Sequence, residues 1–162
     1  ENSGPLVGRS GTAIQFAPNQ GDSSLKLSGN SEIIGDVIFG AGDDMLIVDG
    51  LTSTSGMLST GIFDGGLGEN SVFFNDFSLS NILSFDITDA LIYMSFGIAN
   101  NELFSGKFTN FSTWTFGNDG SFSTEALAGK FMNPSAVPLP AALPLFAFGL
   151  FGLWAGRARL LK

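Results

Sequence analysis

Cysteine and histidine are absent from this chain of 162 residues, and basic residues are scarce. Without cysteine the chain forms no disulfide and offers no thiolate to a metal. Without histidine it lacks the Ser-His-Asp and Cys-His nucleophile systems and the HExxH zinc helix. Seven Lys and Arg against 15 Asp and Glu also argue against nucleic acid as a partner, because phosphates are bound by basic patches.

The charges divide the chain into two unlike parts. Residues 1–136 hold 4 bases and all 15 acids, a net charge of −11, whereas the last 26 residues hold three bases and no acid. Residues 137–156 are a run of 20 apolar, glycine and proline residues just before those bases. About 20 apolar residues cross a bilayer, and flanking bases stay cytoplasmic. We therefore expect a C-terminal transmembrane helix at about 143–156, with the acidic part exported. The three bases are Arg157, Arg159 and Lys162.

A short proline-containing motif precedes this apolar run, and its residues are Val137, Pro138, Leu139, Pro140 and Ala141. The motif, the apolar stretch and the basic tail together resemble a PEP-CTERM sorting signal, in its VPLPA variant. The resemblance covers residues 137–162. It implies a Gram-negative envelope, a precursor anchored in the inner membrane, and cleavage by an exosortase, a membrane-embedded protease-transpeptidase. The cleaved protein is then expected at the cell surface or outside the cell.

The sequence thus predicts three segments. Residues 1–131 form an exported β-rich domain, residues 132–136 a linker, and residues 137–162 the sorting signal. No signal peptide follows Glu1, so either one was removed or the sequence is a fragment.

The exported part is predicted to be all-β. Its apolar runs are short, rich in β-branched and aromatic residues, and separated by Gly, Asn and Asp, which is turn chemistry between strands. Such runs include 37–39, 45–48, 72–74 and 90–94. Residues 102–107 and 124–131 are candidates for short helices, but the all-β prediction does not depend on either.

A degenerate repeat runs through the same region. The pattern is Gly, any residue, a small residue, a polar residue, Asp or Asn, then a strand, and its copies start at Gly40, Gly66 and Gly97, with a weaker one at Gly117. The offsets are 26, 31 and 20 residues. An irregular period of this length is typical of coils that stack with loops of varying length. We predict a right-handed parallel β-solenoid, with an antiparallel β-sandwich as the alternative.

The first two copies also resemble the GGxGxDxUx nonapeptide of calcium-binding β-roll (RTX) proteins. The residues that carry the resemblance are Gly40, Gly42, Asp43, Asp44 and Asn70. It implies Ca²⁺ held by backbone carbonyls and carboxylates, since calcium takes 6 to 8 oxygen ligands. The copies are not in tandem, however, and only one retains its Asp. Calcium is therefore the alternative, and Gly-Asx turns between β-coils are the simpler interpretation.

Catalytic residues are not predicted. There is no G-x-S-x-G elbow, P-loop or dinucleotide fingerprint. Asp86 and Asp89 supply the residue types of a glycosidase pair, which leaves a glycan-active enzyme as a further alternative. Tyr93 and Trp114 could stack on sugar rings, although Trp114 between threonines is the type of residue that fills a core.

Together these features predict an exported, non-enzymatic structural or adhesion protein of an exopolysaccharide or biofilm matrix. Its expected partners are the exosortase, the inner membrane and an exopolysaccharide, with no nucleic acid. This function requires no cofactor. The alternative, a calcium-binding RTX-like module, would require Ca²⁺.

Overall fold

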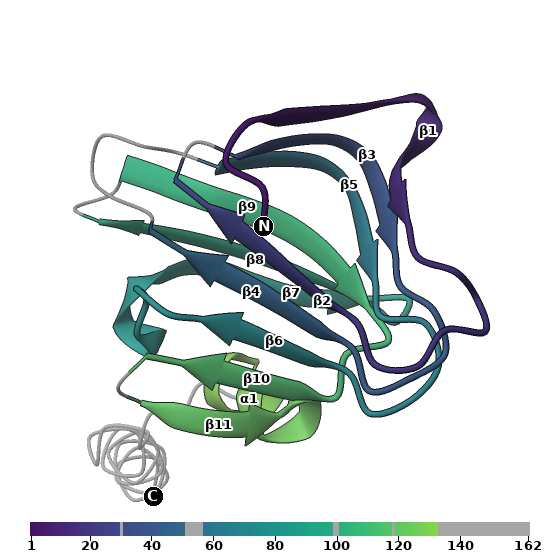
Figure 1. Cartoon of the computed structure of the whole chain (residues 1–162). Helices are drawn as coiled ribbons and strands as arrows, with labels where there is room; N and C mark the ends of the chain where they lie inside the picture. The colour runs from purple at the N-terminus through teal and green to yellow at the C-terminus, as the bar shows by residue number, and fades with distance from the viewer. Residues whose placement is uncertain (30, 51–56, 99–100, 118, 133–162) are drawn as a thin grey trace, which may run out of the picture. The chain divides into compact units, whose positions relative to one another are not determined.

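A computed structural model describes residues 1–29, 31–50, 57–98, 101–117 and 119–132, and these form two β-sheets (Figure 1). The first sheet has the order β1-β3-β5-β9-β8-β7, and the second has the order β11-β10-β6-β4-β2. The strands of the first sheet are β1 (Pro5–Gln15), β3 (Glu32–Ile38), β5 (Met57–Asp64), β7 (Ile82–Thr88), β8 (Leu91–Ile98) and β9 (Asn101–Thr109). Those of the second are β2 (Ser24–Ser28), β4 (Met45–Asp49), β6 (Ser71–Phe74), β10 (Thr113–Phe116) and β11 (Gly120–Ser123).

The chain alternates between the two sheets. Strands β1, β3, β5 and β9 pair parallel in the first sheet, and β2, β4, β6 and β10 pair parallel in the second. A parallel pair needs a crossover connection, and from β1 to β6 the crossover from each strand to the next in its sheet is a strand of the other sheet. Between β5 and β9, and between β6 and β10, the connection also contains the strands β7 and β8. The corners between the sheets therefore recur along the chain.

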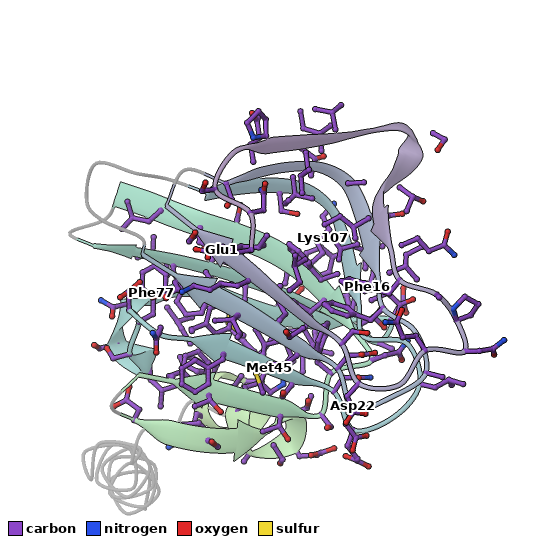
Figure 2. All side chains as sticks on the ribbon, in the orientation of Figure 1. Glu1, Phe16, Asp22, Met45, Phe77 and Lys107 are labelled. Carbon is purple, nitrogen blue, oxygen red and sulfur yellow. The ribbon has the colours of Figure 1, made fainter. Side chains whose placement is uncertain are left out.

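Parallel register places equivalent side chains side by side. In the second sheet alternate residues point inward, as period-two strands require, and the strands β2, β4, β6 and β10 contribute two buried columns between the sheets. Figure 2 shows the side chains that fill this space. The columns are Leu25, Leu46, Val72 and Trp114, and Leu27, Val48, Phe74 and Phe116.

Antiparallel pairing is confined to the C-terminal part of the described strands. There β7, β8 and β9 pair antiparallel, as do β10 and β11. The 3-10 helix η1 (Leu79–Asn81) leads into β7, and the helix α1 (Thr124–Phe131) packs on β10 and β11 with Leu127 buried. The hydroxyl of Ser123 caps α1 by accepting a hydrogen bond from the Ala126 N–H.

The all-β prediction is confirmed, and of the two candidate helices only 124–131 is helical, because 102–107 lies inside β9. The alternative of an antiparallel sandwich is wrong for eight of the described strands, which pair parallel. Among described residues no helix has the length and apolar character of a membrane span. The helix predicted at 143–156 lies outside them.

The repeat is confirmed for its first two copies only. Met45 pairs with Ser71 at an offset of 26, and Ala41 bridges to Leu67. The copy starting at Gly97 falls instead where β8 and β9 pair antiparallel, and Gly117 directly follows β10, in the turn that joins it to its antiparallel partner β11. The reason is that Gly with Asp or Asn suits hairpin turns as well as corners between sheets.

Candidate functional site

The residues predicted to hold calcium do come together, at the corner where the chain enters the second sheet. We call residues 22–23, 43–44, 69–70 and 112 the polar corner, since they precede β2, β4, β6 and β10. Asp22 marks this corner in Figure 2. Asp44 is 1% exposed and Asn70 is 0% exposed, so two polar side chains of this corner lie inside the protein.

Their hydrogen bonds run from one strand entrance to the next. The Ser23 N–H donates to Asp44 Oδ1 (2.7 Å), and the Asp44 N–H donates to Asn70 Oδ1 (2.8 Å). The Asn70 side-chain amide then donates to the Asn110 carbonyl (3.0 Å). Buried backbone N–H groups need such partners, so this inner row of side chains satisfies the backbone where the strands begin.

A second, outer row repeats the arrangement with exposed acids. The Asp43 N–H donates to Asp22 Oδ1 (3.0 Å), and the Glu69 N–H donates to Asp43 Oδ1 (2.9 Å). The Ser112 hydroxyl donates to Glu69 Oε2 (3.1 Å). One oxygen of each of these three carboxylates is therefore already occupied by a donor within the protein.

The glycines of the corner allow the successive passes of the chain to touch. A Cβ on Gly66 would lie 2.2 Å from the Gly40 carbonyl oxygen, and a Cβ on Gly68 would lie 2.1 Å from that of Gly42. Both glycines have positive φ, +76° and +105°. Close backbone approach thus accounts for these glycines without a bound ion.

The donor set fits a calcium ion poorly as it stands. Asp43, Asp44 and Asn70 each use one oxygen as a hydrogen-bond acceptor, whereas calcium needs 6 to 8 oxygens. Within the described ranges no group of three or more His, Cys, Asp or Glu is placed to hold a metal. One observation remains for the calcium alternative: Asp44 Oδ2 is buried and has no hydrogen-bond partner among the residues that the structure describes.

Replacing Asp44 with asparagine is expected to stabilise the protein. Asn70, at the same register one strand on, uses its side-chain NH₂ to donate to carbonyls, and Asp44 Oδ2 has no equivalent bond within the described part of the chain. Relief of an unsatisfied buried oxygen is worth about 1–3 kcal/mol, so Asp44→Asn should raise the free energy of unfolding by roughly that amount. Urea unfolding at neutral pH measures it.

The exposed neighbour provides the matched control for that experiment. Asp43→Asn should change the free energy of unfolding by less than about 0.5 kcal/mol, as surface substitutions usually do. A loss of stability in Asp44→Asn would contradict the expectation and would show that Oδ2 has a partner that only a carboxylate can serve, such as a cation.

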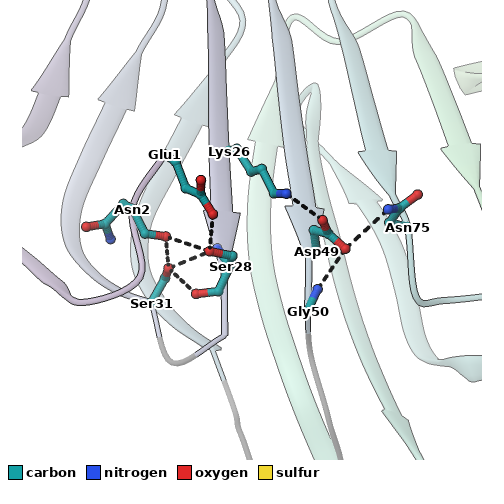
Figure 3. Close-up of polar contacts among 8 residues, drawn as sticks. All are labelled: Glu1, Asn2, Lys26, Ser28, Ser31, Asp49, Gly50 and Asn75. Atoms are coloured by element: carbon teal, nitrogen blue, oxygen red, sulfur yellow. Dashed lines mark hydrogen bonds and ion pairs between the residues drawn. The ribbon is translucent and has the colours of Figure 1, made fainter.

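An ion pair lies at the other end of the same sheet. Lys26 Nζ on β2 is 2.7 Å from Asp49 Oδ2 on β4, and the Asn75 amide and the Gly50 N–H also donate to that carboxylate (Figure 3). The hydrogen bond from Lys26 lowers the pKa of Asp49, and the same contact raises the pKa of Lys26. The pair is exposed to solvent, so its contribution to stability is small. Figure 3 also shows the Ser31 hydroxyl oxygen, which lies 2.6 Å from the Asn2 carbonyl oxygen and 2.9 Å from that of Ser28.

An open depression of about 670 Å³ lies between the polar corner and the start of α1. Glu69 and Glu125 both line it, which makes it the place to test for a glycosidase pair. A glycosidase needs one carboxylic acid of raised pKa. Hydrogen bonds from its own backbone N–H and from Ser123 instead lower the pKa of Glu125. This shift does not suit a general acid.

The second candidate site is a row of serines on the first sheet. Ser84 on β7 pairs with Ser95 on β8, which pairs with Ser105 on β9, and the first two hydroxyls are 2.7 Å apart. Together with Ser59 of β5, Tyr93 and Lys107 they line a depression of about 230 Å³. We call this depression the serine–tyrosine face.

The two aromatic candidates, Trp114 and Tyr93, lie in different surroundings. Trp114 is 0% exposed in the core, where its indole N–H donates to the Thr124 hydroxyl (2.9 Å). Tyr93 is 36% exposed and lies between Asp86 and Lys107 in register. Sequence reasoning missed the serines and Lys107. Alternation along 91–98 would have placed Tyr93 and Ser95 on one side, but their neighbours on β7 and β9 come from tertiary pairing.

The remaining candidates from the sequence stay predictions. The motif 137–141 and the bases Arg157, Arg159 and Lys162 lie outside the described residues. Comparison with known proteins adds nothing on them, because no family model, no curated protein and no solved structure is detectably similar to this chain.

Proposed function

We propose that this chain is an exported, non-enzymatic structural or adhesion protein of an extracellular matrix, built on a right-handed parallel β-solenoid. The observation that carries the proposal is the parallel pairing of strands that alternate between two sheets, with the 26-residue offset between β4 and β6. Each pass through the two sheets is one coil of the solenoid. The handedness is the one expected of parallel crossovers in general.

The coils account for the stability of such a body. The pairs β1–β2, β3–β4, β5–β6 and β9–β10 make four coils, and stacked repeats need about three or more to bury a continuous core. The buried columns of the second sheet run through all four coils. At one end the antiparallel β11 and α1 would serve as the atypical terminal element that solenoids require.

A solenoid presents extended side faces, and such surfaces favour scaffolding or adhesion over small-molecule catalysis. The acids considered for catalysis have simpler roles. The Thr88 hydroxyl donates to Asp86 (2.9 Å), and Asp89 occupies the tight β7–β8 turn with φ of +52°. Tight hairpin turns need positive φ and favour Asp. These roles support a protein without catalytic activity.

Export and sorting are proposed from the sequence. The acidic part would be exported, and 137–162 would hold the precursor in the inner membrane until an exosortase cleaves near 137–141. The product would then be released or joined to the cell surface, within the exopolysaccharide or biofilm matrix of a Gram-negative cell.

The intact mass of the protein recovered from cells and from the medium tests this proposal. A mass that lacks the residues after about Val137 is expected, and any added mass would identify what the protein is joined to. A variant with Val137–Ala141 replaced by alanine is the control and should remain uncleaved. A full-length mass found only in the membrane fraction would contradict sorting and would make the C-terminal part a permanent anchor.

Asp44 Oδ2, which is buried and bonded to none of the described residues, favours a calcium-dependent module as the second candidate. The far-ultraviolet spectrum of the full chain should then be lost in chelator and restored by Ca²⁺, and Asp44→Ala should abolish the restoration. A spectrum that chelator leaves unchanged would remove this candidate.

A further inference from the structure

We infer that the serine–tyrosine face binds one ring of a neutral saccharide. The inference rests on the proposed function, because a matrix polysaccharide is the source of such a ring. It goes beyond that function by naming the residues and the class of ligand. Tyr93 supplies an aromatic ring face, and the serines supply hydroxyls. Asp86 and Lys107 are the register partners of Tyr93 on the two neighbouring strands.

The hydroxyl groups of the face match those of a sugar. Each serine hydroxyl can donate one hydrogen bond and accept others, as each sugar hydroxyl can. Ser84 and Ser95 are already bonded to each other at 2.7 Å, which orients both at the depression. The Ser59 hydroxyl lines the same depression, and it is buried with no hydrogen-bond partner among the described residues. A buried hydroxyl of this kind destabilises the fold unless a ligand or water completes it.

Tyr93 supplies the apolar surface that a sugar ring needs. It is the one tyrosine of the chain, and it is 36% exposed where the neighbouring inward residues Ile92 and Met94 are buried. An aromatic ring with a polar tip packs against the C–H groups of a sugar while its hydroxyl bonds to a substituent. The depression of about 230 Å³ is smaller than the ~300 Å³ at which sites for drug-sized ligands begin, so it suits a single ring.

The charges favour a neutral ligand. Asp86 lies on one side of Tyr93 and Lys107 on the other, so an acceptor and a donor flank the ring without excess of either sign. In the part of the chain that the structure describes, Lys107 has no ion-pair partner within 4 Å, and its ammonium group is free to donate to the ligand. The net charge of −11 over 1–136 repels a polyanion.

Isothermal titration of the full 162-residue chain, kept in mild detergent, tests the inference. The probes are cellohexaose, maltohexaose and chitohexaose as neutral hexamers, with hexagalacturonate as the anionic comparison. Binding of at least one neutral hexamer is expected. Tyr93→Ala should weaken it about tenfold, the equivalent of ~1.4 kcal/mol of lost ring contact. Tyr93→Phe, which keeps the ring face, should retain most of the affinity.

Ser59→Ala separates a binding role from a structural one. It should lower the affinity several-fold while leaving thermal stability unchanged or higher, because it removes an unsatisfied buried group. Leu67→Ala, at an exposed position (73%) away from the face, is the matched control and should change neither quantity.

Three results would overturn the inference. They are no binding of any neutral hexamer, equal binding by Tyr93→Ala and the unaltered chain, and binding of hexagalacturonate alone. Failure of the proposed function is distinguishable from these. A full-length mass in the membrane fraction, with Tyr93-dependent binding intact, would remove the sorted matrix role and keep the saccharide site. A processed protein that binds no neutral hexamer would remove the site alone.

Discussion

Gly68→Ala is expected to lower the free energy of unfolding by about 3–5 kcal/mol, from overpacking against backbone together with a left-handed conformation imposed on an L residue. A Cβ at this position would lie 2.1 Å from the Gly42 carbonyl oxygen, and φ is +105°. The obstacle is backbone, which cannot rotate away as a side chain can. The Asp43 side chain, which accepts the Glu69 N–H, is 3.1 Å from the same Cβ. The hydrogen-bonded rows of the polar corner would therefore be displaced with the chain.

Urea unfolding followed by circular dichroism measures this loss. A domain of this size has a total free energy of unfolding of about 5–15 kcal/mol, so the variant should unfold at a much lower urea concentration. Gly129→Ala is the matched control, because a Cβ there meets no atom of the described residues within 4 Å and the residue is in α1. Alanine in a helix should stabilise by roughly 0.5–1 kcal/mol relative to glycine. Equal effects of the two substitutions would show that the corner is not closely packed.

Phe74→Ala is expected to cost about 3–5 kcal/mol, the usual result of removing a large buried aromatic side chain. Phe74 on β6 is 0% exposed, and its ring packs against aromatic rings of both sheets. Its centroid is 4.5 Å from that of Phe96 and 5.8 Å from that of Phe104, both in the first sheet, and 5.4 Å from that of Phe116 on β10. The cavity left behind would separate rings from both sheets.

Two further variants show whether the loss of stability in Phe74→Ala comes from the cavity that the ring leaves. Phe74→Leu keeps most of the volume and should cost only about 1–2 kcal/mol. Leu83→Ala, at an exposed position (43%) on β7, should change the free energy of unfolding by less than about 0.5 kcal/mol. A small loss in Phe74→Ala would mean that neighbouring rings close the cavity and that the sheets are not held at this position.

The 26-residue offset could be found from the sequence because the two copies carry the same residue types at a parallel register. Gly40 and Gly66 turn the chain at the same corner, and Met45 and Ser71 then begin paired strands. The next true offset, 42 residues from Ser71 to Thr113, could not be found. The hairpin β7–β8 is inserted there, and its turns use the same Gly and Asx chemistry as the corners.

The polar corner is a second place where the sequence leaves the role of its residues undecided. Sequence patterns placed Gly40, Gly42, Asp43, Asp44 and Asn70 together, and they are together. Their role depends on which atom faces which. Because Asp44 Oδ1 and Asn70 Oδ1 accept backbone N–H groups of neighbouring passes of the chain, both side chains act as caps, and Asp44 Oδ2 has no partner among the described residues. Residue type alone does not separate a ligand from a cap.

The sequence by itself determined the all-β class. That class follows from a local property, short β-rich runs between turn residues. Only the tertiary structure decided the direction of strand pairing and the neighbours of Tyr93. Ser84, Ser95 and Ser105 meet because three strands pair antiparallel beside a parallel stack. Such pairing is chosen by which apolar faces can be buried together across the whole chain, and no local stretch contains that information.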